Sequence, residues 1–213
     1  MRIVLFGATG MLGQGVLRVC LADDRVTEVL AVGRSPTGVT HPKLREILRA
    51  DLFDVASFAG EAAGCDACFW CLGVSSLGVP EPEYRRVTHD LTLAVAHVLR
   101  PGMRFVYVSG MGADARSRTM WARVKGETEN ALLELPLDAC VFRPGYVQPL
   151  YGATSRTRYY RLAYVVAAPF HPMLRRLFPR SVTTTEQIGR AMIAVAERGA
   201  PTRILDAAAI NAL

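Results

Sequence analysis

The feature that most constrains this sequence is a glycine-spaced stretch close to its start, Gly7-Ala-Thr-Gly10-Met-Leu-Gly13. It follows a short apolar run, Ile3 to Phe6, and precedes the helical pattern of Met11 to Ala22. In this context Gly7 permits a tight turn, Gly10 lets the backbone approach a pyrophosphate, and Gly13 lets the helix pack on the strand. Unpaired N–H groups at the start of the helix would point at the phosphates. The stretch predicts dinucleotide binding, the alternative being a glycine-rich turn without a ligand. The residues expected at the phosphates are Gly7, Thr9, Gly10, Met11, Leu12 and Gly13.

The rest of the chain alternates apolar runs with helical patterns and short connections. Further strands are predicted at Thr27–Gly33, Leu44–Leu48, Cys65–Leu72, Met103–Ser109, Leu137–Phe142 and Arg203–Leu205, and further helices at Pro82–Leu99, from about Arg118 to Leu135, and from Thr185. This order is typical of an α/β fold with a doubly wound parallel sheet, the Rossmann fold. At 213 residues we expect a single domain, with a nucleotide-binding core over 1–150 and a small substrate or lid region over 151–213.

Ligands of such sheets bind at the carboxyl ends of the strands. Gly7, Arg34, Gly73, Ser109 and Pro144 all fall at predicted strand ends, and their convergence is stronger evidence for a site than any one motif. We expect Leu72 and Gly73 to line the groove beside the diphosphate. Asp51, which follows the third strand, is expected at the adenine edge.

The end of the second strand bears on the choice of cofactor. An acidic residue there binds the ribose 2′-hydroxyl of NAD. This strand ends in Gly33-Arg34-Ser35, without an acid. Arg34 is placed to meet a 2′-phosphate through charge-assisted hydrogen bonds, so we predict NADP(H) rather than NAD(H). A solvated loop arginine is the alternative.

Five cysteines include the spaced set Cys65, Cys68 and Cys71. Side chains alternate along a strand, so Cys68 and Cys71 would face opposite sides and could not share a metal ion. We therefore expect buried thiols and no metal site. No signal peptide fits the start of the chain, and no apolar run approaches the ~18 residues of a membrane span, so a cytoplasmic location is expected.

The positive charge is concentrated late in the chain. Six arginines lie between Arg156 and Arg180 without an acidic residue among them, and they match the whole net charge of +6. We expect this segment to form a lid over the carboxyl end of the sheet, where it could meet an anionic substrate, an acidic partner or an anionic membrane surface. An ordinary surface with buried aromatic residues is the alternative. Proline-broken aromatic sequence matches no standard nucleic-acid module, so no nucleic-acid partner is expected.

Several segments resemble the atypical and extended branches of the short-chain dehydrogenase/reductase family, which include NmrA-like and epimerase-like proteins. The matching residues are Gly7 to Gly13, Val108-Ser109, Lys125-Gly126-Glu127 and Arg143-Pro144-Gly145. The stretch Val124 to Glu129, together with Phe142 to Gly145, looks most like the human Tat-interacting-protein oxidoreductase type. The resemblance covers nearly the whole chain and implies an oxidoreductase that uses a nicotinamide cofactor. With the NADP(H) preference expected from Arg34, we expect an NADP(H)-binding oxidoreductase that acts on a small molecule as a monomer or homodimer.

In that family a serine, a tyrosine and a lysine act together around the nicotinamide. The resemblance assigns the serine to Ser109, which orients the substrate, and the lysine to Lys125, which holds the nicotinamide ribose. The tyrosine, which transfers the proton, should lie four residues before the lysine, on the same face of the helix. That residue is Trp121. An indole N–H can donate a hydrogen bond, but it cannot exchange a proton near neutral pH.

Three interpretations of this departure stay open. Another group supplies the proton: Tyr146, Tyr84 or the substrate itself. Alternatively, hydride transfer proceeds without that acid. In the third interpretation the protein binds NADP(H) as a regulatory or redox-sensing protein and does not catalyse a reaction.

Overall fold

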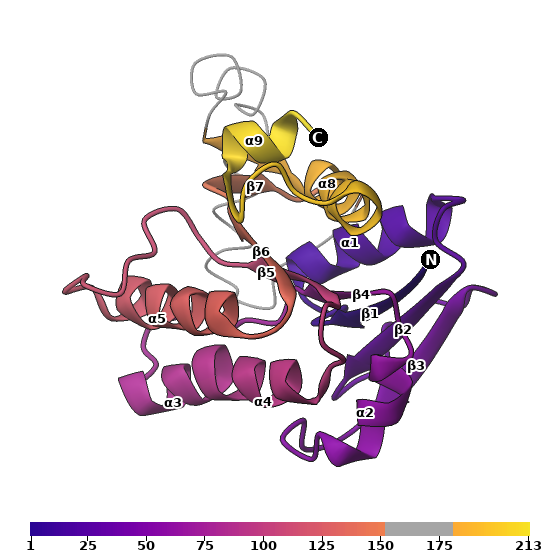
Figure 1. The fold of residues 1–213 in the computed structure, drawn as a ribbon, viewed down its shortest axis with the longest axis horizontal. Coiled ribbons are helices and arrows are strands. Elements are labelled where there is room, and N and C mark those ends of the chain that lie inside the picture. Colours follow the sequence, from indigo (N-terminus) through magenta and orange to yellow (C-terminus); the bar gives the residue numbers. More distant parts are fainter. Residues whose placement is uncertain (152–180) are drawn as a thin grey trace.

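A computed structural model describes residues 1–151 and 181–213 of the chain. The expected lid and membrane contact of Arg156 to Arg180 lie outside the described residues. Among the described residues, no helix is long and apolar enough to cross a membrane. The predicted α/β fold with a doubly wound parallel sheet is confirmed (Figure 1).

A sheet of seven parallel strands forms the centre of the molecule, in the order β3-β2-β1-β4-β5-β6-β9. The order reverses between β1 and β4, so crossovers lead outward in both directions from the middle of the sheet. Strands β1, β4 and β5 lie inside and are almost wholly apolar, as expected for strands covered on both faces. The strands are β1 (Arg2–Phe6), β2 (Glu28–Gly33), β3 (Leu44–Leu48), β4 (Ala67–Trp70), β5 (Arg104–Val108), β6 (Asp138–Arg143) and β9 (Ile204–Asp206). A second, two-stranded sheet pairs β7 (Tyr146–Gln148) with β8 (Val182–Thr184).

The helices form a layer on each face of the large sheet (Figure 1). Helices α1 (Met11–Ala22) and α8 (Thr185–Arg198) cover one face. The other face is covered by α2 (Ala56–Ala63), α4 (Leu91–Val98) and α5 (Met120–Glu134). Helix α3 (Glu81–Arg85) runs into α4 through a π-helical turn, η1 (Arg86–Asp90), and α9 (Ala207–Asn211) ends the chain.

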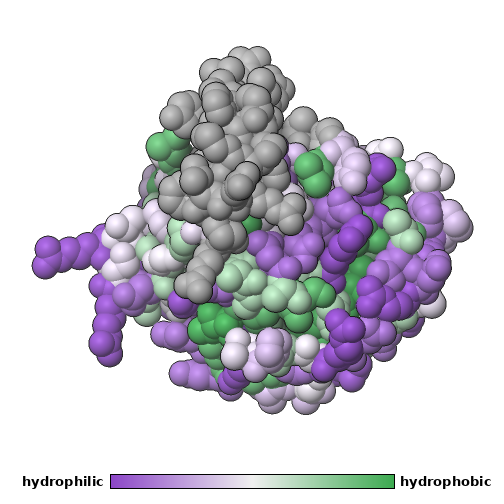
Figure 2. Space-filling view, turned by 90° about the horizontal axis from the view of Figure 1, so that it is seen from above, coloured by the Kyte–Doolittle hydropathy of each residue, from purple (hydrophilic) through white to green (hydrophobic). Residues whose placement is uncertain are grey.

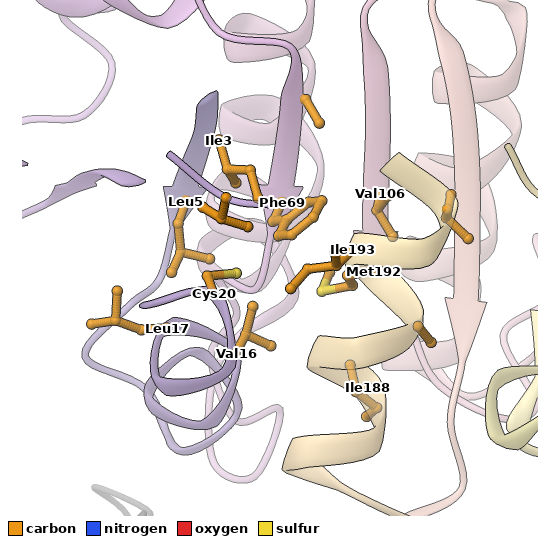
Figure 3. Packing of buried hydrophobic residues seen from close by; sticks show 14 of the residues in the cluster. Ile3, Leu5, Val16, Leu17, Cys20, Phe69, Val106, Ile188, Met192 and Ile193 are labelled. Carbon is orange, nitrogen blue, oxygen red and sulfur yellow. The ribbon is translucent and has the colours of Figure 1, made fainter. Parts of the chain in front are cut away.

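The core under α1 and α8 joins residues from both ends of the sequence (Figure 3). Val16 and Cys20 of α1 and Ile188 and Met192 of α8 point toward the sheet, where they meet side chains such as Phe69. On the opposite face, Phe6, Trp70 and Phe105 form a row of rings with centroids 4.8 and 6.0 Å apart. Apolar burial on both faces therefore fixes the sheet between two helix layers.

The alternation predicted for the fourth strand is confirmed. Cys68 lies in the core under α2, α4 and α5, whereas Cys71 packs against the core under α1 and α8. Burial raises the pKa of both thiols. The two sulfur atoms thus belong to opposite faces of the sheet, as the strand pattern requires.

Four short elements were not predicted: α2, β7, β8 and α9. Their sequences are too short for a clear period, and tertiary contacts hold them. The single helix predicted at Pro82–Leu99 is interrupted by η1, and the fourth strand is shorter than predicted.

On the face shown in Figure 2, apolar and hydrophilic described residues are interspersed.

Candidate active site

The turn after β1 is packed so closely that its glycines are obligatory. Gly7 has a φ of +81°, and a Cβ atom there would lie 2.6 Å from the backbone carbon of Cys71. A Cβ atom on Gly13 would lie 2.0 Å from the carbonyl oxygen of Gly7. Both contacts are shorter than any real packing distance, so the first turn of α1 can approach β1 and β4 only with glycine at these positions.

The start of α1 is open toward this turn. Its N-cap is Gly10, no side chain caps it, and its first turn carries no acidic residue. The N–H groups of that turn therefore keep a partial positive charge that no carboxylate of the turn offsets. A pyrophosphate fits such a cradle, since it needs bare backbone and N–H donors.

A cavity of about 260 Å³ begins at this cradle and runs across the ends of β1, β2 and β4. Of the residues predicted to bind the dinucleotide, six line it: Gly7, Thr9, Gly10, Arg34, Leu72 and Gly73. Met11, Leu12 and Gly13 form the first turn of α1 beside it. Asp51 lies outside this lining, and its carboxylate accepts the N–H of Phe53 at 2.9 Å.

The same cavity contains an acidic residue that was not predicted from the sequence. Glu46 of β3 lines the cavity with Arg34, and its carboxylate accepts the N–H of Thr37 at 2.8 Å. Although β2 does not end in an acidic residue, the neighbouring strand β3 therefore supplies an acidic side chain to the same cavity. Only the pairing of β3 with β2, in which Glu46 lies beside Ala31, brings it there. The available sequence signal was an acid on the same face of β3 as Leu44 and Leu48.

Helix α5 directs Trp121 and Lys125 toward the end of β5. The Lys125 ammonium donates to the carbonyl oxygen of Val108 at 3.3 Å and lies 5.4 Å from the centre of the Tyr107 ring. The Trp121 ring packs on the following loop, where a Cβ atom on Gly110 would lie 3.7 Å from the indole. Burial lowers the pKa of Lys125 to about 8, an effect that the Glu129 carboxylate partly opposes. This amine therefore exchanges its proton close to neutral pH.

The side chain of Ser109 also points to α5, but its partner there is Glu129 and not Trp121 or Lys125. Its hydroxyl donates to the carboxylate of Glu129, a residue of α5 that is 1% exposed. Arg143, at the end of β6, forms an ion pair with the same carboxylate. The next residue, Pro144, accepts the N–H of Met111 through its carbonyl oxygen at 3.0 Å. A polar cluster thus ties the ends of β5 and β6 to α5, and its central residue, the buried Glu129, was not predicted as a site residue from the sequence.

The two tyrosines considered as proton donors differ in their surroundings. Tyr84 is 2% exposed in the core beneath α3. Tyr146, on β7, is half-buried and donates its hydroxyl hydrogen to Gln148 at 2.6 Å. Burial raises the pKa of Tyr146. Of the two, Tyr146 is the more accessible from solvent.

The sequence matches known proteins over most of its length. Residues 7–159 match the family described as NAD(P)H-binding. The protein HTATIP2 of Rattus norvegicus is 28% identical over 148 residues, which cover 67% of this chain and 61% of the rat protein. The mitochondrial protein fmp52 of Emericella nidulans is 30% identical over 159 residues, covering 68% of this chain and 66% of that protein. The chain thus spans less than two thirds of the length of these relatives.

Solved structures share the fold at low sequence identity. A short-chain dehydrogenase family protein from Francisella tularensis superposes with a TM-score of 0.65 at 13% identity, covering 93% of this chain and 91% of that one. The Bordetella bronchiseptica enzyme WbmG, solved in complex with NAD, has a TM-score of 0.69 at 13% identity, with coverage of 96% and 71%. The family match over residues 7–159, together with the glycine cradle, shows that the chain belongs to the NAD(P)H-binding family, and the solved structures show that it shares their Rossmann-type fold.

Proposed function

We propose that the protein is an NADP(H)-dependent oxidoreductase of the atypical short-chain type, which acts on a small-molecule carbonyl or alcohol with an altered proton-transfer group. The observation that carries the proposal is the pair Trp121 and Lys125. Both side chains lie on one face of α5 at the end of β5, and strand order puts that end beside the glycine cradle of β1 through β4. The pairing supports a nicotinamide placed next to Lys125.

The preference for NADP(H) rests on Arg34. Arg34 lines the cavity beyond β2, and its guanidinium forms no ion pair with any described residue. A phosphate on the adenosine ribose would give it a charge-assisted, bidentate partner. Such a bond to a charged group contributes about 1.5–3 kcal/mol, which corresponds to a preference of at least tenfold.

Each protein group near the end of β5 has a defined part in this proposal. The bound nicotinamide supplies or takes up a hydride. Lys125 binds the nicotinamide ribose and, with its lowered pKa, holds the proton that Trp121 cannot exchange. Because the Ser109 hydrogen is donated to Glu129, Ser109 offers its lone pairs to a substrate hydroxyl. Tyr146 is the alternative proton source.

A second function is favoured by the same tryptophan. Trp121 replaces the residue that transfers protons in the family, and the Ser109 hydrogen is occupied. A protein with these features could bind NADP(H) as a regulatory or redox-sensing protein without turnover. The two functions differ in whether bound NADPH is ever consumed.

The test combines cofactor binding with turnover. NADPH and NADH are titrated calorimetrically into the wild-type protein and Arg34→Ala, and NADPH oxidation is followed with a panel of aldehydes and ketones. We expect tighter binding of NADPH, a preference lost in Arg34→Ala, and slow oxidation. Equal affinities for the two cofactors would refute the NADP preference, and binding without oxidation of NADPH by any compound of the panel would favour the regulatory function.

Substitution of Trp121 tests whether a hydroxyl group at this position can transfer the proton. Trp121→Tyr should raise the oxidation rate at least tenfold, because a positioned general acid contributes about 10²–10⁴-fold. Trp121→Phe is the matched control, since phenylalanine has the ring of tyrosine but not its hydroxyl group. Equal rates in the two variants would show that the hydroxyl does not reach the substrate.

The proposal also includes a cellular location and an oligomeric state. We infer a cytoplasmic monomer or homodimer that works on a small molecule, although the fungal relatives are named mitochondrial proteins. Fractionation of the native host, followed by sedimentation of the purified protein, tests both statements. Recovery in an organelle fraction would contradict the first.

A further inference from the structure

Two opposite charges face the adenosine end of the cavity without neutralising each other. Arg34 follows β2 and Glu46 belongs to β3, and both line the cavity. Among the described residues they form no ion pair with each other or with any other side chain. Because no described side chain neutralises either charge, both can form charge-assisted hydrogen bonds with a ligand.

Glu46 is held in place by the backbone of the loop that carries Arg34. One carboxylate oxygen accepts the N–H of Thr37 at 2.8 Å, and the Thr37 hydroxyl in turn accepts the N–H of Val39 at 3.2 Å. The second carboxylate oxygen accepts no hydrogen bond from the described residues. Glu46, which lines the cavity, therefore orders the loop with one carboxylate oxygen and keeps the other available to a ligand.

We propose that Glu46 is a specificity-determining residue, which binds a hydroxyl of the adenosine ribose and limits the preference for NADP(H) that Arg34 creates. The inference rests on the proposed function, because it takes the adenosine ribose to lie at Arg34. A ribose with free hydroxyl groups donates to the Glu46 carboxylate. A ribose with a 2′-phosphate gains Arg34 but brings a second negative charge close to Glu46.

In this proposal Arg34 favours NADP(H) through its charge, and Glu46 favours NAD(H). Glu46 is solvent-exposed, so its repulsion of a phosphate is screened and moderate. We expect its removal to change the ratio of the two affinities by about three- to tenfold, as for an exposed charge pair of ~1 kcal/mol. The effect should shrink in high salt, since the Debye length is only about 3 Å at 1 M.

The test compares three variants in calorimetric titrations with NADPH and NADH. Glu46→Gln removes the charge but keeps a carbonyl oxygen for the Thr37 N–H, so the loop stays ordered. Glu46→Ala removes both the charge and the bond. Glu134→Gln, at an exposed position near the end of α5, is the matched control for net charge. We expect the ratio of NADPH to NADH affinity to rise three- to tenfold in Glu46→Gln and to stay unchanged in Glu134→Gln.

The outcomes separate this inference from the proposed function. A ratio that Arg34→Ala lowers but Glu46→Gln leaves unchanged would overturn the role of Glu46 and leave the proposed function standing. A rise of the same size in Glu134→Gln would also overturn it, because the effect would then follow net charge. If neither cofactor binds the wild-type protein, the proposed function fails and this inference with it. A loss of both affinities in Glu46→Ala, with a raised ratio in Glu46→Gln, would support both tasks of the carboxylate.

Discussion

Lys125 shows how burial prepares a single side chain for proton exchange. Its amine lies 5.4 Å from the centre of the Tyr107 ring and donates to the backbone of Val108, so the charge is partly removed from water. Burial lowers the pKa from 10.5 to about 8. The Glu129 carboxylate, one helical turn away, opposes this shift and is itself engaged by Ser109 and Arg143.

This environment predicts a pH dependence for the reaction. In the proposed reaction, reduction of a carbonyl needs the ammonium form of Lys125, which is present below a pKa of about 8. The rate of NADPH oxidation should therefore be level below about pH 7 and fall close to tenfold per pH unit above pH 8. The measurement is a pH profile of the wild-type protein beside that of Lys125→Arg, whose charge does not titrate in this range. The same fall in both proteins would assign it to another group.

The burial of Lys125 should also affect the free energy of unfolding. The drop of the pKa from 10.5 to about 8 corresponds to ~3 kcal/mol between the two protonation states. Because the side chain is only half-buried, we expect Lys125→Met to raise the free energy of unfolding at pH 7 by about 1–2 kcal/mol. The unfolded state binds more protons than the native state between pH 8 and 10.5, so the wild-type protein should regain this difference as the pH rises. Denaturant titrations at pH 7 and pH 10 test the sign.

The contact between α1 and α8 decides how closely the helix of the phosphate cradle is held. A Cβ atom on Gly15 would lie 2.4 Å from the Cβ atom of Thr185, and one on Gly189 would lie 2.9 Å from the Cβ atom of Val19. Each helix therefore offers a glycine to a side chain of the other. The N-cap of α8, Thr184, accepts the N–H of Gln187 and fixes where that helix begins.

We predict that Gly15→Ala destabilises the protein by about 1–3 kcal/mol, the usual effect of overpacking a close contact. Alanine favours a helix by ~1 kcal/mol over glycine, so any loss reflects the contact alone. Gly60→Ala in α2 is the matched control, because no atom lies within 4 Å of its added Cβ. The control should be unchanged or more stable by up to about 1 kcal/mol. Urea unfolding of the two variants measures both, and equal stabilities would contradict the tight α1–α8 contact.

The elements that the sequence predicts well are those whose period persists over a whole strand or helix. Strand β1, the glycine turn and α1 were predicted together, since each excludes alternatives for the next. The position of Glu46 beside Arg34 depends on the pairing of β3 with β2, and the tie between Ser109 and Glu129 depends on the packing of α5 on β5. Such contacts join residues remote in sequence, and no local pattern indicates them. The roles assigned to Ser109, Trp121 and Lys125 stay predictions.

At the scale of the whole molecule, the candidate cofactor site is joined to the core. The cavity is lined by the end of β2 and by the residues that directly follow β1 and β4, two strands that are covered on both faces of the sheet. The core under α1 and α8 also includes Leu205 and Ile210 from the last two elements of the chain. Residues from the beginning and the end of the sequence thus bury one another, and a ligand that holds the start of α1 should stabilise the entire fold.

We therefore predict that NADPH raises the melting temperature of the whole protein in a single transition. At 100 times its dissociation constant, a ligand of the native state adds about 2.7 kcal/mol, which corresponds to about 5–10 °C for a domain of this size. Gly10→Ala is the control: the φ of −78° at Gly10 suits alanine, but the added methyl group would lie 3.3 Å from the Gly7 carbonyl oxygen, in the approach of the pyrophosphate. This variant should fold and melt near the wild-type temperature, yet gain little from NADPH. Differential scanning calorimetry with and without NADPH measures both proteins. A shift of equal size in Gly10→Ala would place the ligand away from the glycine cradle, and a wild-type protein whose melting NADPH leaves unchanged would contradict binding to the native state.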